Sequence, residues 1–172
     1  GAMHEDGLAD TADGLWGGWS KEHRLKIMKD THIGTYGVVA LVLCVGLRWQ
    51  ALGEVIDQGT LWAAVLSVAI LSRAVMVPMM ALLPNARDHG LSHAVGRPDM
   101  ATACIAYGIA SLAALILLHM AGLWLIALTA LSATACAAIA KTKIGGQTGD
   151  ILGATQQITE ISLLLALSSL LS

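Results

Sequence analysis

Three aspartates near the N-terminus are spaced so that a helix would bring them to one face. Asp6, Asp10 and Asp13 would lie within a stripe roughly 60° wide at about 100° per residue. Carboxylates gathered so closely need a cation, and oxygen ligands without a nearby cysteine or paired histidine favour Mg²⁺ or Mn²⁺ over zinc. An ordinary helix start is the alternative, but capping needs only one acid. The spacing therefore predicts a metal site for Mg²⁺ or Mn²⁺.

A second polar segment leads into the first apolar stretch. Lys29 and its basic neighbours could neutralise phosphate charge, and Asp30 could join the metal or orient a nucleophile. A basic cluster held by anionic lipid headgroups would have the same composition. The residues alone leave both interpretations open.

A glycine-rich segment, residues 145–150, precedes the last apolar stretch. Free backbone N–H groups at a helix N-terminus favour an anion, and Lys141 and Lys143 lie immediately upstream. A turn followed by an Asp150 cap is the alternative, and no Gly-Lys-Ser/Thr sequence of a P-loop follows. We predict phosphate contacts here. The candidate residues are Gly145, Gly146, Thr148 and Gly149.

Arg73 lies in the middle of an apolar stretch, where an unpaired cation costs about 2.5 to 3.5 kcal/mol. Candidate partners occupy the last stretch, where Asp150, Gln157 and Glu160 would share a helix stripe of about 80°. Arg73 is therefore either a functional cation or the partner of Glu160 in a pair that locks two helices. Pro78, in the same stretch as Arg73, predicts a bend.

The elements that must position these residues are membrane helices. The 172-residue chain is 56% hydrophobic and 13% charged, which is too apolar for a soluble domain of this length. Five stretches are long enough to cross a bilayer. They are residues 33–49, 61–83, 100–119, 122–140 and 151–171. Only Met120 and Ala121 separate the third stretch from the fourth, which predicts a tight antiparallel hairpin. We predict an all-α fold, a polytopic membrane helix bundle of about five transmembrane helices, preceded by a cytoplasmic segment with the acidic motif.

The distribution of charge predicts an orientation for this bundle. Basic residues gather before the first stretch, between the second and third, and between the fourth and fifth, so the positive-inside rule places these segments in the cytoplasm. Arg48, at the end of the first stretch, is counted with Glu54 and Asp57 on the opposite side. Residues 4–14, which we call the acidic run, and the polar loops at 84–90 and 145–150 would thus share one face of the membrane. A net charge of −2 without a basic block excludes nucleic-acid binding.

Taken in order, these motifs resemble the cobalamin synthase family, the adenosylcobinamide-GDP ribazoletransferases. The resemblance rests on several segments spread over almost the whole chain. They are His4 to Gly14, Arg24 with Ile27 to Asp30, Gly34 to Gly37, Arg73, Leu83 and Pro84 with Arg87, Gly145 to Asp150, Gly153 with Ala154, and Glu160.

The resemblance implies an Mg²⁺-dependent enzyme of the bacterial inner membrane, with its active site facing the cytoplasm. It would join adenosylcobinamide-GDP to α-ribazole, or to its 5′-phosphate, with release of GMP. The site residues it implies fall into three groups. They are Asp6, Asp10 and Asp13 for metal and catalysis, with Asp13 as the base; Lys29, Arg73, Arg87 and the glycine-rich loop for phosphate; and Asp30, Asp150, Gln157 and Glu160 in support.

Residues 1–172 are expected to form one membrane-embedded domain of this family. Its members carry a further membrane segment before the acidic run, so we expect a truncated form. Membrane lipid is the expected surrounding, and a homo-oligomer is compatible with the sequence. Two other functions remain open. They are a transporter in which Arg73, Gln157 and Glu160 line a substrate path, and a non-catalytic membrane fragment.

Overall fold

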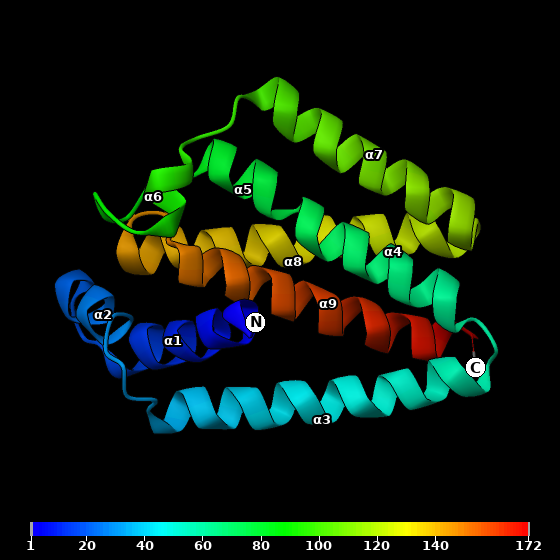
Figure 1. Cartoon of the computed structure of the whole chain (residues 1–172), viewed down its shortest axis with the longest axis horizontal. Coiled ribbons are helices and arrows are strands. Elements are labelled where there is room, and N and C mark those ends of the chain that lie inside the picture. The colour runs from blue at the N-terminus through cyan, green and yellow to red at the C-terminus, as the bar shows by residue number, and fades with distance from the viewer. Residues whose placement is uncertain (1, 172) are drawn as a thin grey trace.

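The computed structural model describes residues 2–171, which form an arrangement of helices (Figure 1). Within these residues there is no strand, only an isolated bridge between Asn85 and Gln147. The helices, in chain order, are α1 (Met3–Gly17), α2 (Lys21–Ile27), α3 (Thr35–Asp57), α4 (Leu61–Ala74), α5 (Met76–Leu82), α6 (Leu91–Val95), α7 (Met100–Leu118), α8 (Met120–Ile144) and α9 (Gly149–Leu171).

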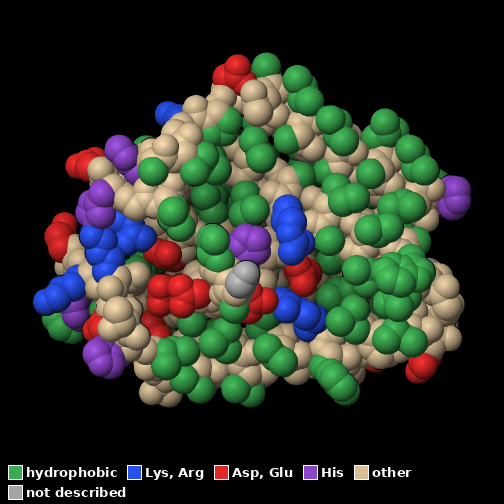
Figure 2. All heavy atoms as spheres, viewed as in Figure 1, with side chains coloured by type: hydrophobic (Ala, Val, Ile, Leu, Met, Phe, Trp, Pro, Cys, Tyr) green, Lys and Arg blue, Asp and Glu red, His purple; other side chains and the backbone are tan. Residues whose placement is uncertain are grey.

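Five helical segments of the described chain are long and apolar enough to cross a membrane: α3, α4 with α5, α7, α8 and α9. Their outer faces carry large exposed apolar side chains such as Val42, Ile105 and Leu131. In Figure 2, apolar side chains cover much of the surface over α3, α4 and α7, whereas many charged and histidine side chains gather at the end that holds α2 and α6. An exposed apolar surface of this kind fits lipid, and the predicted multi-pass membrane bundle is confirmed.

Helix α9 forms the centre of the bundle. Of the residues in the apolar membrane-spanning stretch of α9, 67% are buried inside the protein, against 17 to 39% in the other four spans. Leu163 and Leu167 of α9 pack with Val68 and Leu71 of α4 and Leu125 of α8 in the main apolar core. Polar residues of α9 such as Thr155, Gln156 and Gln157 therefore lie inside the protein.

The predicted stretch 61–83 is divided into two helices. Helix α4 ends at Ala74 and α5 begins at Met76, four and two residues before Pro78. Proline lacks an N–H donor, and its ring clashes with the carbonyl four residues earlier, which here belongs to Ala74. The predicted effect of Pro78 on this stretch takes the form of a break between α4 and α5.

Helices α7 and α8 form the predicted antiparallel hairpin, with His119 between them in a positive-φ conformation (φ 50°). The two backbones meet at Gly122, where a Cβ atom would lie 2.6 Å from the carbonyl oxygen of Ala114. Only glycine allows this approach.

One boundary predicted from the sequence is wrong. The first apolar stretch is expected to end at Trp49, but helix α3 continues to Asp57, so Glu54 and Asp57 lie within the same helix as Arg48. The helix can continue past this charge because Arg48 contacts two carboxylates, Glu5 of α1 and Glu160 of α9.

Candidate functional site

The acidic run forms helix α1, as its spacing predicts, and α1 packs between α3 and α9. Two glycines allow this close packing. A Cβ atom on Gly7 would lie 2.9 Å from the carbonyl oxygen of Asp150, and one on Gly153 would lie 3.2 Å from the Cα atom of His4. The crossing of α1 and α9 at these glycines brings Asp150 to the acidic face of α1.

Asp13 connects the end of α1 to the start of α3. Its Oδ2 atom accepts a hydrogen bond from the backbone N–H of Gly34 at 2.7 Å, and its Oδ1 atom accepts one from Gly37 at 2.9 Å. These amides belong to the first turn of α3, so Asp13 caps that helix from a neighbouring one. A Cβ atom at Gly34 or Gly37 would lie 2.5 or 2.4 Å from the carboxylate oxygens. Both positions therefore need glycine, and Asp13 has a structural role at the start of α3.

Asp10 lies among other carboxylates on the same face. Burial raises the pKa of Asp10, and the charges of Asp6, Asp150 and Asp13 add to this effect, so that the pKa reaches about 7 although Arg87 opposes the shift. Within residues 2–171, no three aspartate, glutamate, histidine or cysteine side chains are already arranged to enclose a metal ion. The face nevertheless concentrates negative charge that a cation would relieve.

The two polar loops meet beside this face, as predicted. The backbone N–H of Ala86 donates to the Gln147 carbonyl at 2.9 Å, and the N–H of Gln147 donates to the Pro84 carbonyl at 2.8 Å. Arg87 forms an ion pair with Asp150, and both side chains are largely buried. Residues 84–90, residues 145–150 and the acidic run therefore form one cluster.

Within the glycine-rich loop, Thr148 caps α9. Its Oγ1 atom accepts a hydrogen bond from the N–H of Ile151 at 3.2 Å, and the residue is 1% exposed. Gly145 ends α8 in the left-handed conformation at φ 80°, and a Cβ on Gly146 would lie 2.1 Å from the Pro84 carbonyl oxygen. The capping role that the alternative interpretation gave to Asp150 thus belongs to Thr148, while phosphate contact with this loop stays a prediction.

Two cavities flank Asp6, which lines both. The first, of about 360 Å³, lies between α1, α5, α6 and the start of α9, and Arg87 and Thr148 line it. The second, of about 510 Å³, lies between α1 and residues 28–33, and Asp10, Lys29 and Asp30 line it. Lys29 also contacts His89 of the first cavity, so the basic and acidic segments are brought together. The division into two cavities could not be predicted, because α6 carries only a five-residue helical pattern.

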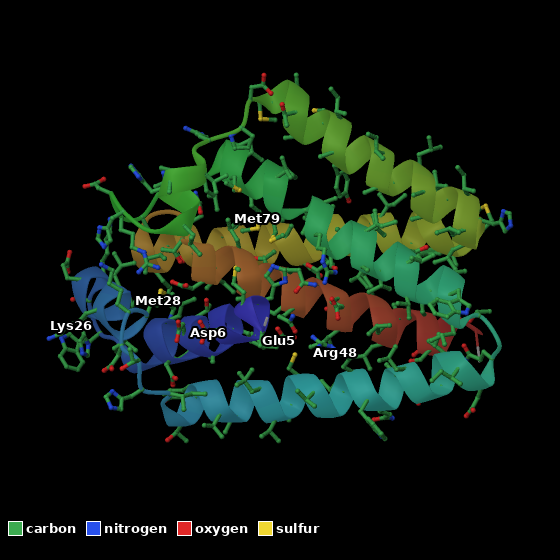
Figure 3. The ribbon with its side chains drawn as sticks, in the orientation of Figure 1. Glu5, Asp6, Lys26, Met28, Arg48 and Met79 are labelled. Atoms are coloured by element: carbon green, nitrogen blue, oxygen red, sulfur yellow. The ribbon has the colours of Figure 1, made fainter. Side chains whose placement is uncertain are left out.

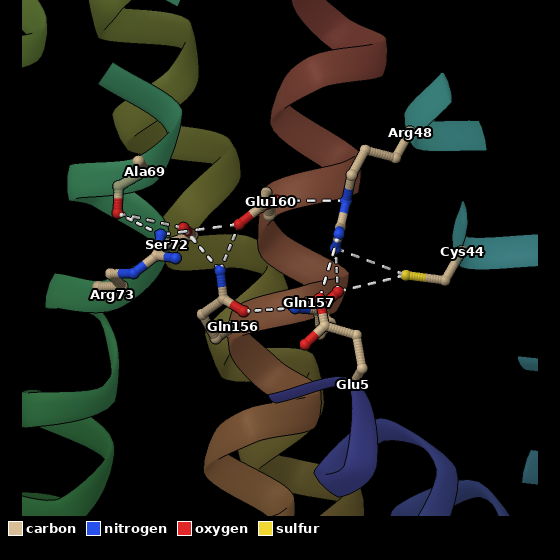
Figure 4. Close-up of polar contacts among 9 residues, drawn as sticks. All are labelled: Glu5, Cys44, Arg48, Ala69, Ser72, Arg73, Gln156, Gln157 and Glu160. Carbon is tan, nitrogen blue, oxygen red and sulfur yellow. Dashed lines mark hydrogen bonds and ion pairs between the residues drawn. The ribbon is translucent and has the colours of Figure 1, made fainter. Parts of the chain in front are cut away.

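Arg73, Gln157 and Glu160 do not join this cluster. They lie on a second polar network, in which Glu160 of α9 stands between Arg73 of α4 and Arg48 of α3 (Figure 4). The Arg48 Nε atom is 3.3 Å from Glu160 Oε1, and the Arg73 Nη1 atom is 3.7 Å from Glu160 Oε2. Glu160 follows Asp150 by ten residues, about 15 Å along a helix. The Arg73–Glu160 pair anticipated as one alternative is present.

Arg48 is the member of this network that sequence reasoning missed. Its Nη1 atom lies 3.2 Å from Glu5 Oε1, and its guanidinium also contacts the Gln157 side chain. Figure 3 shows Glu5 and Asp6 as neighbours on α1, with Arg48 extending from α3 toward Glu5. An arginine within an otherwise apolar run was the available signal.

The sequence matches one known protein family over almost its whole length. The family model for cobalamin-5-phosphate synthase matches residues 1–168. Three relatives, each called adenosylcobinamide-GDP ribazoletransferase, come from Bradyrhizobium diazoefficiens, Sinorhizobium medicae and Rhizobium meliloti. They are 45%, 44% and 46% identical to this chain over 96%, 98% and 98% of its length.

The chain spans about two thirds of the length of these relatives, covering 64%, 68% and 68% of them. No solved structure matches the chain. The family model covers nearly all of the sequence, including the acidic helix, both polar loops and the network around Glu160. The chain belongs to the cobalamin-5-phosphate synthase family.

Proposed function

We propose that this chain is a membrane transferase that joins adenosylcobinamide-GDP to α-ribazole, or to its 5′-phosphate, and releases GMP. The observation that carries the proposal is the acidic face of α1, which stands beside Arg87 and the glycine-rich loop with a cavity on either side of Asp6. Two substrates that react with each other need two compartments meeting at one point. The names of the relatives supply the substrates.

The proposed reaction is a displacement at phosphorus. A ribose hydroxyl oxygen of α-ribazole forms a bond to the phosphorus that carries cobinamide, and the anhydride bond to GMP breaks. The bonding electrons leave with GMP, and the hydroxyl proton passes to a carboxylate of the acidic face. Lys29 and Arg87, which line the cavities, would balance the charge of the pyrophosphate.

The donor groups present suit Mg²⁺. All are oxygen ligands, and the crowding of carboxylates that raises the pKa of Asp10 to about 7 would be relieved by a divalent cation. Asp6 and Asp10 would hold the ion, whereas the oxygens of Asp13 already accept hydrogen bonds from Gly34 and Gly37. When bound, Mg²⁺ would offset charge on the phosphate oxygens.

We further propose that the site faces the cytoplasm from the bacterial inner membrane. Basic residues are concentrated in the segments that join α1 to α3 and α5 to α7, and in the last turn of α8 before the glycine-rich loop. Positive charge of this kind favours the cytoplasmic side. Lipid would cover the exposed apolar faces of the spans.

The test uses the chain reconstituted in phospholipid vesicles, with GMP release and the corrinoid product measured together. Asp10→Asn is expected to lower Mg²⁺-dependent turnover by at least about 100-fold, because it removes a metal ligand or proton acceptor. Asp57→Asn is the matched control, since Asp57 is exposed at the other end of α3. Unchanged turnover in Asp10→Asn would exclude the catalytic assignment, and substrate flux without GMP release would favour a transporter.

A further inference from the structure

The two cavities beside Asp6 have different walls. We propose that the first cavity, between α1, α5, α6 and the start of α9, binds the apolar bicyclic base of α-ribazole, and that the second cavity receives the guanosine diphosphate end of adenosylcobinamide-GDP. This assignment rests on the proposed function and deepens it.

One wall of the first cavity is apolar and includes Met76 and Met80 of α5 and Leu91 and Val95 of α6. Charged and polar side chains of α1 and of the two polar loops line the remainder. Leu91 and Val95 lie one helical turn apart on the same face of α6 and are 67% and 76% exposed. Methionine sulfur makes favourable contacts with aromatic rings, and its flexible chain adapts to their shape. A flat aromatic base would cover the side chains that are otherwise left exposed.

Three polar side chains of the same cavity, Asn85, Ser92 and Gln147, are bonded to one another. The Gln147 side-chain amide donates to Asn85 Oδ1, and the Ser92 hydroxyl donates to Gln147 Oε1. Gln147 is 2% exposed. These bonds fasten α6 to the polar loops and use hydrogen-bonding capacity that a guanine edge would need. Guanine would lose hydrogen bonds with water in this cavity, which costs free energy of binding. The base of α-ribazole, a benzimidazole with fewer polar edge atoms, largely avoids this cost.

The second cavity offers the complementary chemistry. Lys29, Asp30, Thr31 and His32 line it and are exposed. A primary ammonium can bind phosphate, and a carboxylate and a hydroxyl can bond the polar edge of guanine.

The positions of the cavities also fit an in-line displacement. Met3 lines the first and Ala9 the second, on opposite flanks of Asp6. In such a reaction the entering hydroxyl and the leaving GMP must lie on opposite sides of phosphorus. The first cavity, at about 360 Å³, lies in the range of about 300 to 1,000 Å³ found for small-molecule pockets. The corrin macrocycle, a much larger group, is left outside both cavities.

The decisive variants alter only the apolar wall. Met80→Trp fills the first cavity, and Leu91→Ala with Val95→Ala removes two exposed side chains on which the fold does not depend. Each variant is expected to weaken α-ribazole binding by about tenfold or more, as losses in apolar pockets commonly do. The KM for adenosylcobinamide-GDP should stay within about twofold. Met120→Trp is the matched control, because Met120 is 72% exposed and lies outside both cavities.

Two readouts separate this inference from the proposed function. Equilibrium dialysis of labelled α-ribazole against the whole chain in detergent micelles measures binding without turnover, and steady-state GMP release gives both KM values. Absence of GMP release from the unaltered chain would refute the proposed function, while loss of α-ribazole binding in the wall variants would still support the assignment. Unchanged α-ribazole binding in both wall variants, a rise confined to the KM for adenosylcobinamide-GDP, or displacement of α-ribazole by added phospholipid would overturn it.

Discussion

At the scale of single residues, the aspartates of α1 serve different purposes although they share one face. Asp13 is 7% exposed and accepts two backbone hydrogen bonds from the start of α3. Asp10 is half-buried among like charges, and Asp6 is exposed where the two cavities meet. The same side chain is thus structural at one position and electrostatically strained three residues earlier.

The strain at Asp10 predicts a pH-dependent stability. Its pKa in the folded protein, about 7, lies above the ordinary value of 3.8. Below both values the carboxyl is protonated in both states. As the pH rises between them, the unfolded chain ionises first, so stability falls and the full penalty is present above pH 7. Asp10→Asn should therefore raise the unfolding midpoint at about pH 8.5 and change it little at about pH 4.

Thermal unfolding in detergent micelles without divalent cations measures this difference. Asp57→Asn, an exposed aspartate outside the site, controls for the loss of one charge. An equal shift of the midpoint at both pH values would contradict the argument. If Asp10 helps to hold Mg²⁺, adding the ion should stabilise the unaltered chain at about pH 8.5 more than the variant.

The aspartate stripe could be predicted from the sequence because residues three and four apart always share a helix face. The separate roles of the three aspartates could not be predicted, because each depends on residues far away in the sequence. The partners of Asp13 are Gly34 and Gly37, and the strain at Asp10 depends on Asp150, which is distant in the chain. Arg48 escaped prediction for the same reason, since its partners are Glu5 and Glu160.

At the scale of elements, the crossing of α1 and α9 joins the acidic run to the glycine-rich loop. Gly7 and Gly153 remove the side chains that would hold the two backbones apart. The long apolar stretches, the hairpin and the effect of Pro78 could be predicted because each is a local property of the chain. The short helices α2 and α6 could not, since neither is long enough to show a helical period.

Gly7→Ala tests the crossing. The added Cβ would lie 2.9 Å from the Asp150 carbonyl oxygen, a backbone atom that cannot move without moving α9. Overpacking of this kind costs about 1 to 3 kcal/mol, so a lower unfolding midpoint is expected. Turnover should fall by about tenfold or more because Asp10 and Asp150 are displaced relative to each other.

Gly46→Ala provides the matched control in α3, because nothing lies within 4 Å of the added Cβ there. Alanine is a better helix former than glycine, so this variant should be as stable as the unaltered chain or more stable by up to about 1 kcal/mol. Unfolding in micelles and GMP release in vesicles measure both variants. Similar behaviour of the two would show that the crossing tolerates a side chain.

At the scale of the whole molecule, a partly buried charged network connects the helices of a bundle whose outside is largely apolar. Glu5 of α1, Arg48 of α3, Arg73 of α4 and Glu160 of α9 connect four helices (Figure 4). Burial raises the pKa of Glu5, but its own backbone amide and Arg48 outweigh this effect and hold the pKa below its ordinary value. Asp13 anchors the other end of α1, so the acidic face is fixed between two polar contacts.

Arg48→Met tests how much this network contributes to the stability of the fold. The Arg48 and Glu5 side chains are 22% and 31% exposed, so the cost should exceed the roughly 0 to 1 kcal/mol of an exposed pair. It should approach the roughly 3 to 5 kcal/mol of a buried one, since Glu5 and Glu160 are left without this cation. Arg73→Met should cost less, because Arg73 is 52% exposed and 3.7 Å from Glu160.

Arg48→Lys should not restore stability, because an ammonium lacks the planar fork that reaches Glu5 and Glu160 from different nitrogens. A double-mutant cycle of Arg48→Met and Glu5→Gln, read from unfolding in micelles, measures their coupling. We expect Glu5→Gln to recover part of the stability lost in Arg48→Met, since it removes a carboxylate that has lost its partner. A coupling energy near zero would mean that the network does not hold α1, and that the position of the acidic face depends on Asp13 and the glycine crossing alone.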